Sequence, residues 1–191
     1  MQGSRGEAYH AGKNLLRAMP EELRAAVGRG EDRRMSDRAV LRRIVDLLEG
    51  AGCPYELIEH PPARTAREAA AARGTPLELG TKAILLKYDG EFGIFALNAS
   101  RQIRSALIRR GLRVRRTRFA QREELLAMTG LEPGAVPPFG EPVLPFPLFA
   151  DPSALAGAAM VFTAGCRSVS IRMATADYRL IARPRVLPFA R

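Results

Sequence analysis

Two lysines at the ends of a predicted β-strand are the first candidates for chemistry in this chain. Lys82 and Lys87 bracket an apolar run, and an ammonium beside apolar neighbours can hold a polar or anionic substrate group by charge. Side-chain alternation places Lys82 on the face of Ile84 and Leu86, and Lys87 on the opposite face. A lysine at a strand end also commonly extends into water, so this stretch supports either a substrate anchor at Lys82 or a surface residue.

A loop rich in glycine and proline is the second candidate. Residues 132–140 read EPGAVPPFG, a composition incompatible with a helix or a central strand. Rigid prolines around two glycines can form a backbone shape that aims N–H groups at a ligand oxygen. An ordinary turn is the alternative interpretation of the same residues.

Two single side chains are weaker candidates. His60 closes a predicted strand and could act as a base or a ligand, but no companion histidine or carboxylate cluster accompanies it, so a hydrogen-bonded, positional role is the simpler interpretation. Cys166 lies in a predicted turn. Nothing in the sequence places a base beside its thiol, so an inert or pocket-lining thiol competes with a nucleophile.

Arginines are concentrated in residues 101–118, without nearby compensating acids. Guanidinium groups at this density can follow a phosphate backbone, whereas a solvated helix face and edge strand is the alternative. No aromatic residues alternate with them, which argues against a base-stacking platform. The residues expected to contact an RNA backbone are Arg101, Arg104, Arg109, Arg113, Arg115 and Arg116.

The composition is that of a soluble globular protein that attracts polyanions. Its 191 residues, 47% hydrophobic and 26% charged, suit one domain plus an appendage. The formal net charge of +10 favours nucleic acid as a partner, although a GC-rich genome would also raise the arginine content. No apolar run approaches the ~20 residues that cross a bilayer and no secretory signal is present, so we expect a cytoplasmic protein without membrane contact. Cys53 and Cys166 form no CxxC pair, and we expect no metal, disulfide framework or cofactor.

Periodicity and turn signals predict the elements that must position these residues. Residues 1–35 form a basic N-terminal extension of low or conditional order with one short helical candidate, and the folded domain spans 36–191. Residues 178–188 show a mixed pattern that predicts no element. The predicted helices are 20–27, 36–50, 65–73 with a Thr65–Glu68 capping box, 99–111, 121–128 and a short one capped by Asp151-Pro152. The predicted strands are 55–60, 82–86, 92–97, 144–149, 160–164 and 169–173, with a hairpin turn at Asp89-Gly90.

The order of these features resembles one known family. A strand ending in Glu59-His60-Pro61, a Thr65-led helix, the Lys82 strand and Gly165-Cys166 accompany the run TGLEPGAVPPFG at residues 129–140. From about residue 36 to the C-terminus the chain resembles the YbaK/ProX family of trans-editing aminoacyl-tRNA deacylases, related to the editing domain of bacterial prolyl-tRNA synthetase. The resemblance implies an α+β fold in which a curved, mixed, partly barrel-like sheet is flanked by helices.

The resemblance also implies hydrolysis of a mischarged small amino acid, such as alanine or cysteine, from the proline tRNA. Lys82 would hold the aminoacyl end, and the Gly134 N–H would orient or polarise the scissile carbonyl. An aminoacyl ester is already activated, so a positioned water or the substrate's own hydroxyl or thiol suffices as nucleophile. The resemblance further implies substrate contacts from His60, Thr65, Pro138, Phe139, Gly140, Gly165 and Cys166.

Departures from the family pattern keep alternatives open. Pro137 replaces a small hydroxyl residue, the turn reads Gly165-Cys166-Arg167-Ser168, and residues 169–171 lack the acid or histidine of some members. A non-catalytic nucleic-acid-binding module is therefore the second hypothesis, and an unrelated small-ligand binder the third. The expected partner is aminoacylated tRNA, with an aminoacyl-tRNA synthetase as a further candidate; the oligomeric state is not predicted.

Overall fold

The elements follow the predicted order closely. The computed structural model describes residues 33–191, with side chains from residue 38 onward, so the predicted helix at 20–27 lies outside them. Within this range no helix is both long and apolar enough to cross a bilayer. The elements are α3 (Arg33–Gly50), β1 (Tyr55–Glu59), α4 (Ala66–Arg73), the 3₁₀-helix η2 (Leu77–Leu79), β2 (Thr81–Tyr88), β3 (Glu91–Asn98), α5 (Ser105–Leu112), β4 (Thr117–Phe119), α6 (Arg122–Thr129), β5 (Leu148–Ala150), the 3₁₀-helix η3 (Pro152–Leu155), β6 (Ala159–Thr163), β7 (Val169–Ala174), α7 (Thr175–Ala182) and β8 (Arg185–Val186).

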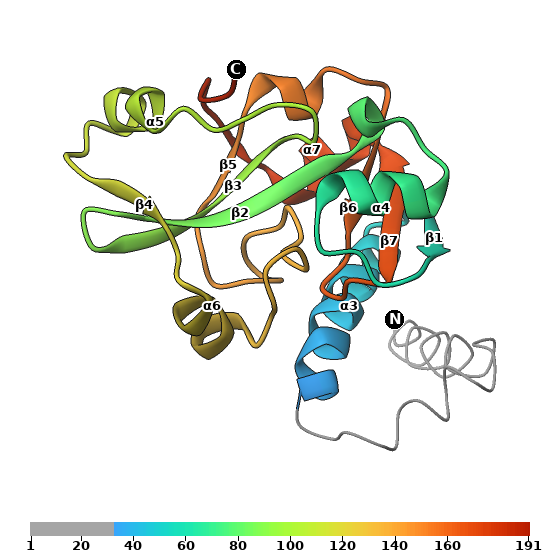
Figure 1. Cartoon of the computed structure of the whole chain (residues 1–191). Coiled ribbons are helices and arrows are strands. Elements are labelled where there is room, and N and C mark those ends of the chain that lie inside the picture. The colour runs from blue at the N-terminus through green and yellow to red at the C-terminus, as the bar shows by residue number, and fades with distance from the viewer. Residues whose placement is uncertain (1–32) are drawn as a thin grey trace, which may run out of the picture.

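The strands form two sheets, which Figure 1 shows side by side. One has the order β4-β2-β3-β5-β8 and mixes antiparallel with parallel pairs; the other is the antiparallel sheet β1-β7-β6. An isolated bridge between Gly80 and Val161 joins them. The predicted α+β class is confirmed, with two sheets in place of the single curved, partly barrel-like sheet expected.

The β2–β3 hairpin forms as predicted. Its register pairs Lys82 with Leu97, and its turn uses Asp89 and Gly90, both with positive φ (43° and 103°). Both faces of β2 are packed, because Leu85 belongs to the larger apolar cluster and Leu86 to a second one. Lys82 and Lys87 therefore leave the strand on opposite faces, as alternation predicts.

Three predictions about element bounds are wrong. The helix expected at 36–50 begins at Arg33, and the helix expected at 99–111 begins at Ser105. The strand expected at 144–149 is reduced to β5, because Pro145 and Pro147 have no N–H to donate to a ladder. The C-terminal residues for which no element was predicted form α7 and β8.

Asp151 fastens the C-terminal segment to the sheet. The carboxylate is 5% exposed and accepts hydrogen bonds from the N–H groups of Ser153 (2.9 Å), Phe189 (2.7 Å) and Ala190 (2.8 Å). Burial opposes ionisation, but these hydrogen bonds outweigh it and lower the pKa of Asp151. The bonds hold the fully buried Phe189 edge-on against Phe95.

We predict that Asp151→Asn destabilises the fold in a pH-dependent way. In either orientation the amide N–H₂ of asparagine faces an N–H group, that of Ser153 or those of Phe189 and Ala190, which should cost about 2–4 kcal/mol. Because the folded-state pKa of Asp151 is lowered, its contribution is complete above the unfolded value of about 3.9 and is lost as pH falls through the folded value. Urea denaturation should show the wild-type advantage narrowing below about pH 4. Glu59→Gln, on an exposed residue, is the control, and an equal loss in both variants would contradict the prediction.

Candidate functional site

Three loops that are distant in sequence converge beside the smaller sheet. The loop after β1 donates from His60 N to Ser168 O (2.9 Å) and from Ala63 N to Arg167 O (3.0 Å). The turn between β6 and β7 donates from Gly165 N to Ala135 O (3.1 Å). The structure thus brings five predicted site residues into one region: His60, Thr65, Gly134, Gly165 and Cys166.

Gly134 occupies a position that admits no side chain. Its φ is +92°, and a Cβ atom there would lie 2.7 Å from the carbonyl oxygen of Arg64. The residue is exposed, and its N–H donates to no acceptor within residues 33–191. Gly134 therefore offers an unused backbone donor at the surface, next to the residue preceding Thr65.

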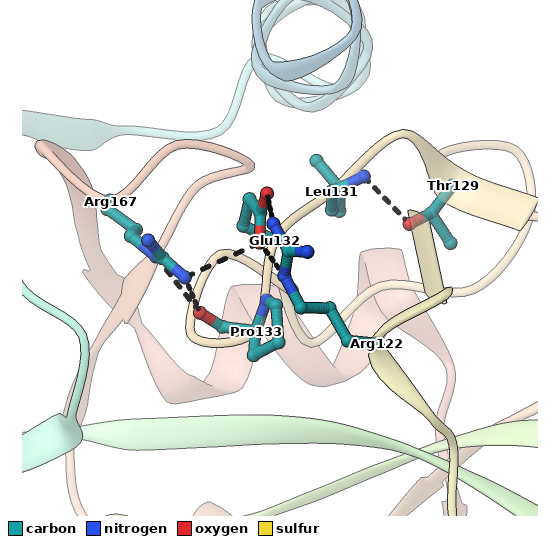
Figure 2. A network of polar contacts seen from close by, with 6 residues as sticks. All are labelled: Arg122, Thr129, Leu131, Glu132, Pro133 and Arg167. Atoms are coloured by element: carbon teal, nitrogen blue, oxygen red, sulfur yellow. Dashed lines mark hydrogen bonds and ion pairs between the residues drawn. The ribbon is translucent and has the colours of Figure 1, made fainter. Parts of the chain in front are cut away.

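A carboxylate between two arginines holds the loop that carries Gly134 (Figure 2). Glu132 accepts from Arg122 Nε (2.9 Å) and an Arg122 terminal nitrogen (2.6 Å), and Arg167 approaches it at 3.8 Å. The Arg167 guanidinium also donates to Pro133 O at 3.0 and 2.8 Å. Sequence reasoning missed Arg122 and Arg167, although an acid inside a rigid loop is a signal that basic partners lie nearby.

A chain of hydrogen bonds connects α4 to His60. Arg73 donates to Ser170 Oγ (3.0 Å), Ser170 Oγ lies 2.8 Å from His60 Nε2, and His60 Nδ1 lies 2.9 Å from Pro61 O. A carbonyl only accepts, so Nδ1 carries a proton; in the neutral ring Nε2 then accepts, and the Ser170 hydroxyl donates to it. Both nitrogens of His60 are engaged within the protein, which matches its positional interpretation. Sequence reasoning missed Arg73 and Ser170 as its partners.

Lys82 lies at the junction of the two sheets. Its ammonium donates to Ala99 O (3.0 Å), burial lowers its pKa, and within the described residues no carboxylate lies within 4 Å of it. A Cβ on Gly80 would lie 3.0 Å from Ala99 Cβ and 3.7 Å from the guanidinium of Arg73. Burial also lowers the pKa of Arg73, which likewise has no carboxylate partner among the described residues. Two partly buried cations therefore lie near this junction, while Lys82 and Gly134 share no hydrogen bond.

Three other predicted substrate residues lie in the interior. Phe139 is 1% exposed, with its ring edge-on to Phe162 and Tyr178, and Tyr178 donates to Pro138 O (2.6 Å). Gly140 is buried where a Cβ would lie 2.6 Å from Phe146 O. These residues pack in the interior beneath the loop that carries Gly134. Their contact with substrate stays a prediction.

The thiol of Cys166 is partly buried and lies 3.0 Å from Ser168 Oγ. A hydroxyl is not a base of the kind that activates a thiol for nucleophilic attack. Across residues 33–191 there is no group of three or more histidine, cysteine, aspartate or glutamate side chains placed to hold a metal ion.

The predicted RNA-binding arginines divide into two groups. Arg109, Arg115 and Arg116 line an open depression at the tip of the β2–β3 hairpin, together with Lys87 and Arg118. The remaining three, Arg101, Arg104 and Arg113, do not line it.

Comparison with known proteins decides the family. A family model described as the aminoacyl-tRNA editing domain matches residues 60–181. The chain belongs to this family. The match contains His60, the Lys82 strand, the loop around Gly134 and Ser170, and the resemblance to the YbaK/ProX deacylases is confirmed.

A relative of this editing domain is a tRNA deacylase by name. The chain is 30% identical over 156 residues to the multifunctional Ser/Thr-tRNA deacylase ProXp-y of Escherichia coli K12, covering 78% of this chain and 92% of that protein. The O157:H7 strain has a protein of the same name with the same identity and coverage. The prediction of an ester hydrolase that edits aminoacyl-tRNA is confirmed at the level of the family.

Solved structures share the editing-domain fold. Hypothetical protein APE2540 superposes with a TM-score of 0.70 at 18% identity, over 78% of this chain and 99% of that one. A protein crystallised as a candidate trans-editing enzyme for prolyl-tRNA synthetase gives 0.69 at 23% identity, over 80% and 97%. These likenesses establish the fold.

We predict that Gly134→Ala is more damaging than an alanine at another glycine of positive φ. Gly52 has φ +64° and open space around it, so Gly52→Ala should cost only the left-handed conformation, about 1–2 kcal/mol. Gly134→Ala adds the clash with Arg64 O and should lower the midpoint of urea denaturation further. Equal denaturation midpoints for Gly134→Ala and Gly52→Ala would show that the close approach to Arg64 adds no cost to a side chain at residue 134.

We predict that Ser170→Ala destabilises the fold by about 1–3 kcal/mol, because it leaves buried donors and acceptors of Arg73 and His60 without a partner. The matched control is Thr175→Val, since Thr175 Oγ1 is buried with no hydrogen-bond partner in the described part of the chain. Thermal unfolding should separate the two variants. A Ser170→Ala protein as stable as Thr175→Val would argue against the hydrogen-bond chain.

Proposed function

We propose that this editing domain hydrolyses the ester that links a small amino acid to the 3′ end of tRNA. The carbonyl of the ester accepts a hydrogen bond from Gly134 N–H, and Lys82 holds the aminoacyl end. The observation that carries the proposal is the unused N–H of Gly134, exposed on a loop that Glu132 and two arginines hold in place.

A fixed N–H is what ester hydrolysis requires from a protein of this kind. Negative charge grows on the carbonyl oxygen as water attacks, and a donor already in position stabilises that charge without reorganising. The ester is activated, so the attacking water needs orientation more than a strong base. This agrees with a site in which His60 has no free ring nitrogen and Cys166 has no base beside it.

Lys82 suits the anchoring role because its charge is not neutralised. The ammonium is partly buried, its protein hydrogen bond is to a neutral carbonyl, and no described carboxylate competes for it. In partly desolvated surroundings a charge attracts a polar substrate group more strongly than in water. A substrate that reaches both Lys82 and Gly134 would span the junction of the two sheets.

The proposed side chain is small. The resemblance to the YbaK/ProX family implies alanine or cysteine on proline tRNA, and the 30% identical relative is named for serine and threonine. All four are small side chains, so we propose this size class, with alanine or cysteine on proline tRNA as the specific substrate. Cleavage of bulky aminoacyl esters would contradict it.

The test is single-turnover deacylation of tRNAs carrying alanine, cysteine, serine, threonine or a bulky residue. We expect wild type to cleave at least one small ester well above the rate in buffer, and Lys82→Met to lose about 10-fold or more, the cost of one charge-assisted hydrogen bond. Lys87→Met, on the opposite face of the same strand, is the matched control. At saturating protein its single-turnover rate should equal that of wild type. A chain that binds these tRNAs but cleaves none is a binding module, and full activity of Lys82→Met would remove Lys82 from the mechanism.

A further inference from the structure

A basic depression lies at the end of β2 opposite to Lys82. Its volume is about 970 Å³, and its cations are Lys87, Arg109, Arg115, Arg116 and Arg118. They come from the hairpin, from α5, and from β4 with the segment that leads into it, which lie near one another on the side of the hairpin tip in Figure 1. We define this set as the basic depression.

Three of the five cations have no carboxylate partner. Arg118 binds Glu124 with two hydrogen bonds of 2.6 Å, and Lys87 lies 3.7 Å from the same carboxylate. Among the described residues no carboxylate lies within 4 Å of the guanidinium groups of Arg109, Arg115 or Arg116. Within residues 33–191, Asp89 is the one acidic residue in the lining and Glu124 pairs with two of the five cations, so the depression keeps an excess of positive charge, which attracts phosphate oxygens.

Asp89 lies in the depression and organises it. Its carboxylate accepts from Arg115 N (2.9 and 3.1 Å) and from Arg116 N (2.8 Å), and its own N–H donates to Arg116 O (3.2 Å). These backbone hydrogen bonds lower the pKa of Asp89. The hairpin turn therefore positions the backbone of both arginines while leaving their side chains available.

We propose that the basic depression docks the phosphodiester backbone of the double-stranded part of tRNA, without reading its bases. The inference rests on the proposed function for the choice of RNA. The volume exceeds the need of a single phosphate, and the lining contains no aromatic side chain of the kind that stacks single-stranded bases. Phe119, which is 55% exposed, follows Arg118 but does not line the depression.

The depression is separate from the proposed ester site. Lys82 and Lys87 are five residues apart on β2, which is about 17 Å at 3.3 Å per residue, and they leave opposite faces of the strand. Docking here would raise affinity for tRNA without contact with the reacting ester. Arg179 and Arg183, two exposed arginines at the end of α7 that do not line the depression, provide a matched pair of arginines.

The test measures binding of the full chain to three probes: uncharged proline tRNA, an RNA duplex hairpin and a single-stranded RNA of the same length. Arg115→Ala/Arg116→Ala, which keeps the backbone N–H groups that bind Asp89, should weaken tRNA and duplex binding about 10-fold or more. The slope of log K against log salt should become shallower by about 0.9 for each phosphate that the variant no longer neutralises. Arg179→Ala/Arg183→Ala should stay within about twofold of wild type. Thermal unfolding checks that both double variants are folded.

Equal losses in the two double variants, or no loss in Arg115→Ala/Arg116→Ala, would overturn the proposal. Tighter binding of the single-stranded probe, together with weaker binding by Phe119→Ala, would also overturn the proposal. That result would indicate that this surface binds the single-stranded 3′ end of tRNA. The result is separable from the proposed function. In Arg115→Ala/Arg116→Ala the single-turnover cleavage rate at saturating protein should equal that of wild type. If wild type binds RNA but cleaves no ester, the proposed deacylase function fails and the docking proposal stands.

Discussion

The register of the β2–β3 hairpin determines where the candidate functional groups lie. Pairing Lys82 with Leu97 places that lysine at the junction of the two sheets, and the turn at Asp89 brings the hairpin tip against the segment before β4. A shift of one residue would move Lys82 to the other face and take Leu85 and Leu86 out of their respective cores. The positions of both cationic regions thus follow from the packing of the hairpin.

The cations of this protein differ in whether a carboxylate is paired with them. Glu132 is bound by Arg122 and Arg167, and these contacts hold a loop. In contrast, Arg73, Lys82 and three arginines of the basic depression have no carboxylate partner among the described residues. In a chain with a net charge of +10, the paired cations hold loops in place, whereas Lys82 and the three arginines keep a charge that can attract an anionic group.

Local signals in the sequence predicted the elements better than the contacts between them. Asp89-Gly90 between alternating runs predicted the hairpin, and the Gly- and Pro-rich loop was correctly placed outside regular structure. The hydrogen bond between Arg73 and Ser170 joins residues 97 positions apart, and no periodicity reports such a pair. The six predicted arginines could not be sorted from sequence either, because Asp89 positions Arg115 and Arg116 from across the hairpin turn, and Arg109 reaches the depression from α5.

The hydrogen-bond chain through Ser170 and His60 has a direction. Each donor points the same way, from the guanidinium at the end of α4 to the carbonyl of Pro61, because the guanidinium only donates and the carbonyl only accepts. Bonds aligned in this way polarise one another, so the chain acts as a single dipole and not as three separate contacts. The partly buried charge of Arg73 is linked, through Ser170 and His60, to the start of the loop on which Gly134 packs. The last turn of a helix is thereby coupled electrostatically to the backbone beside the proposed ester site.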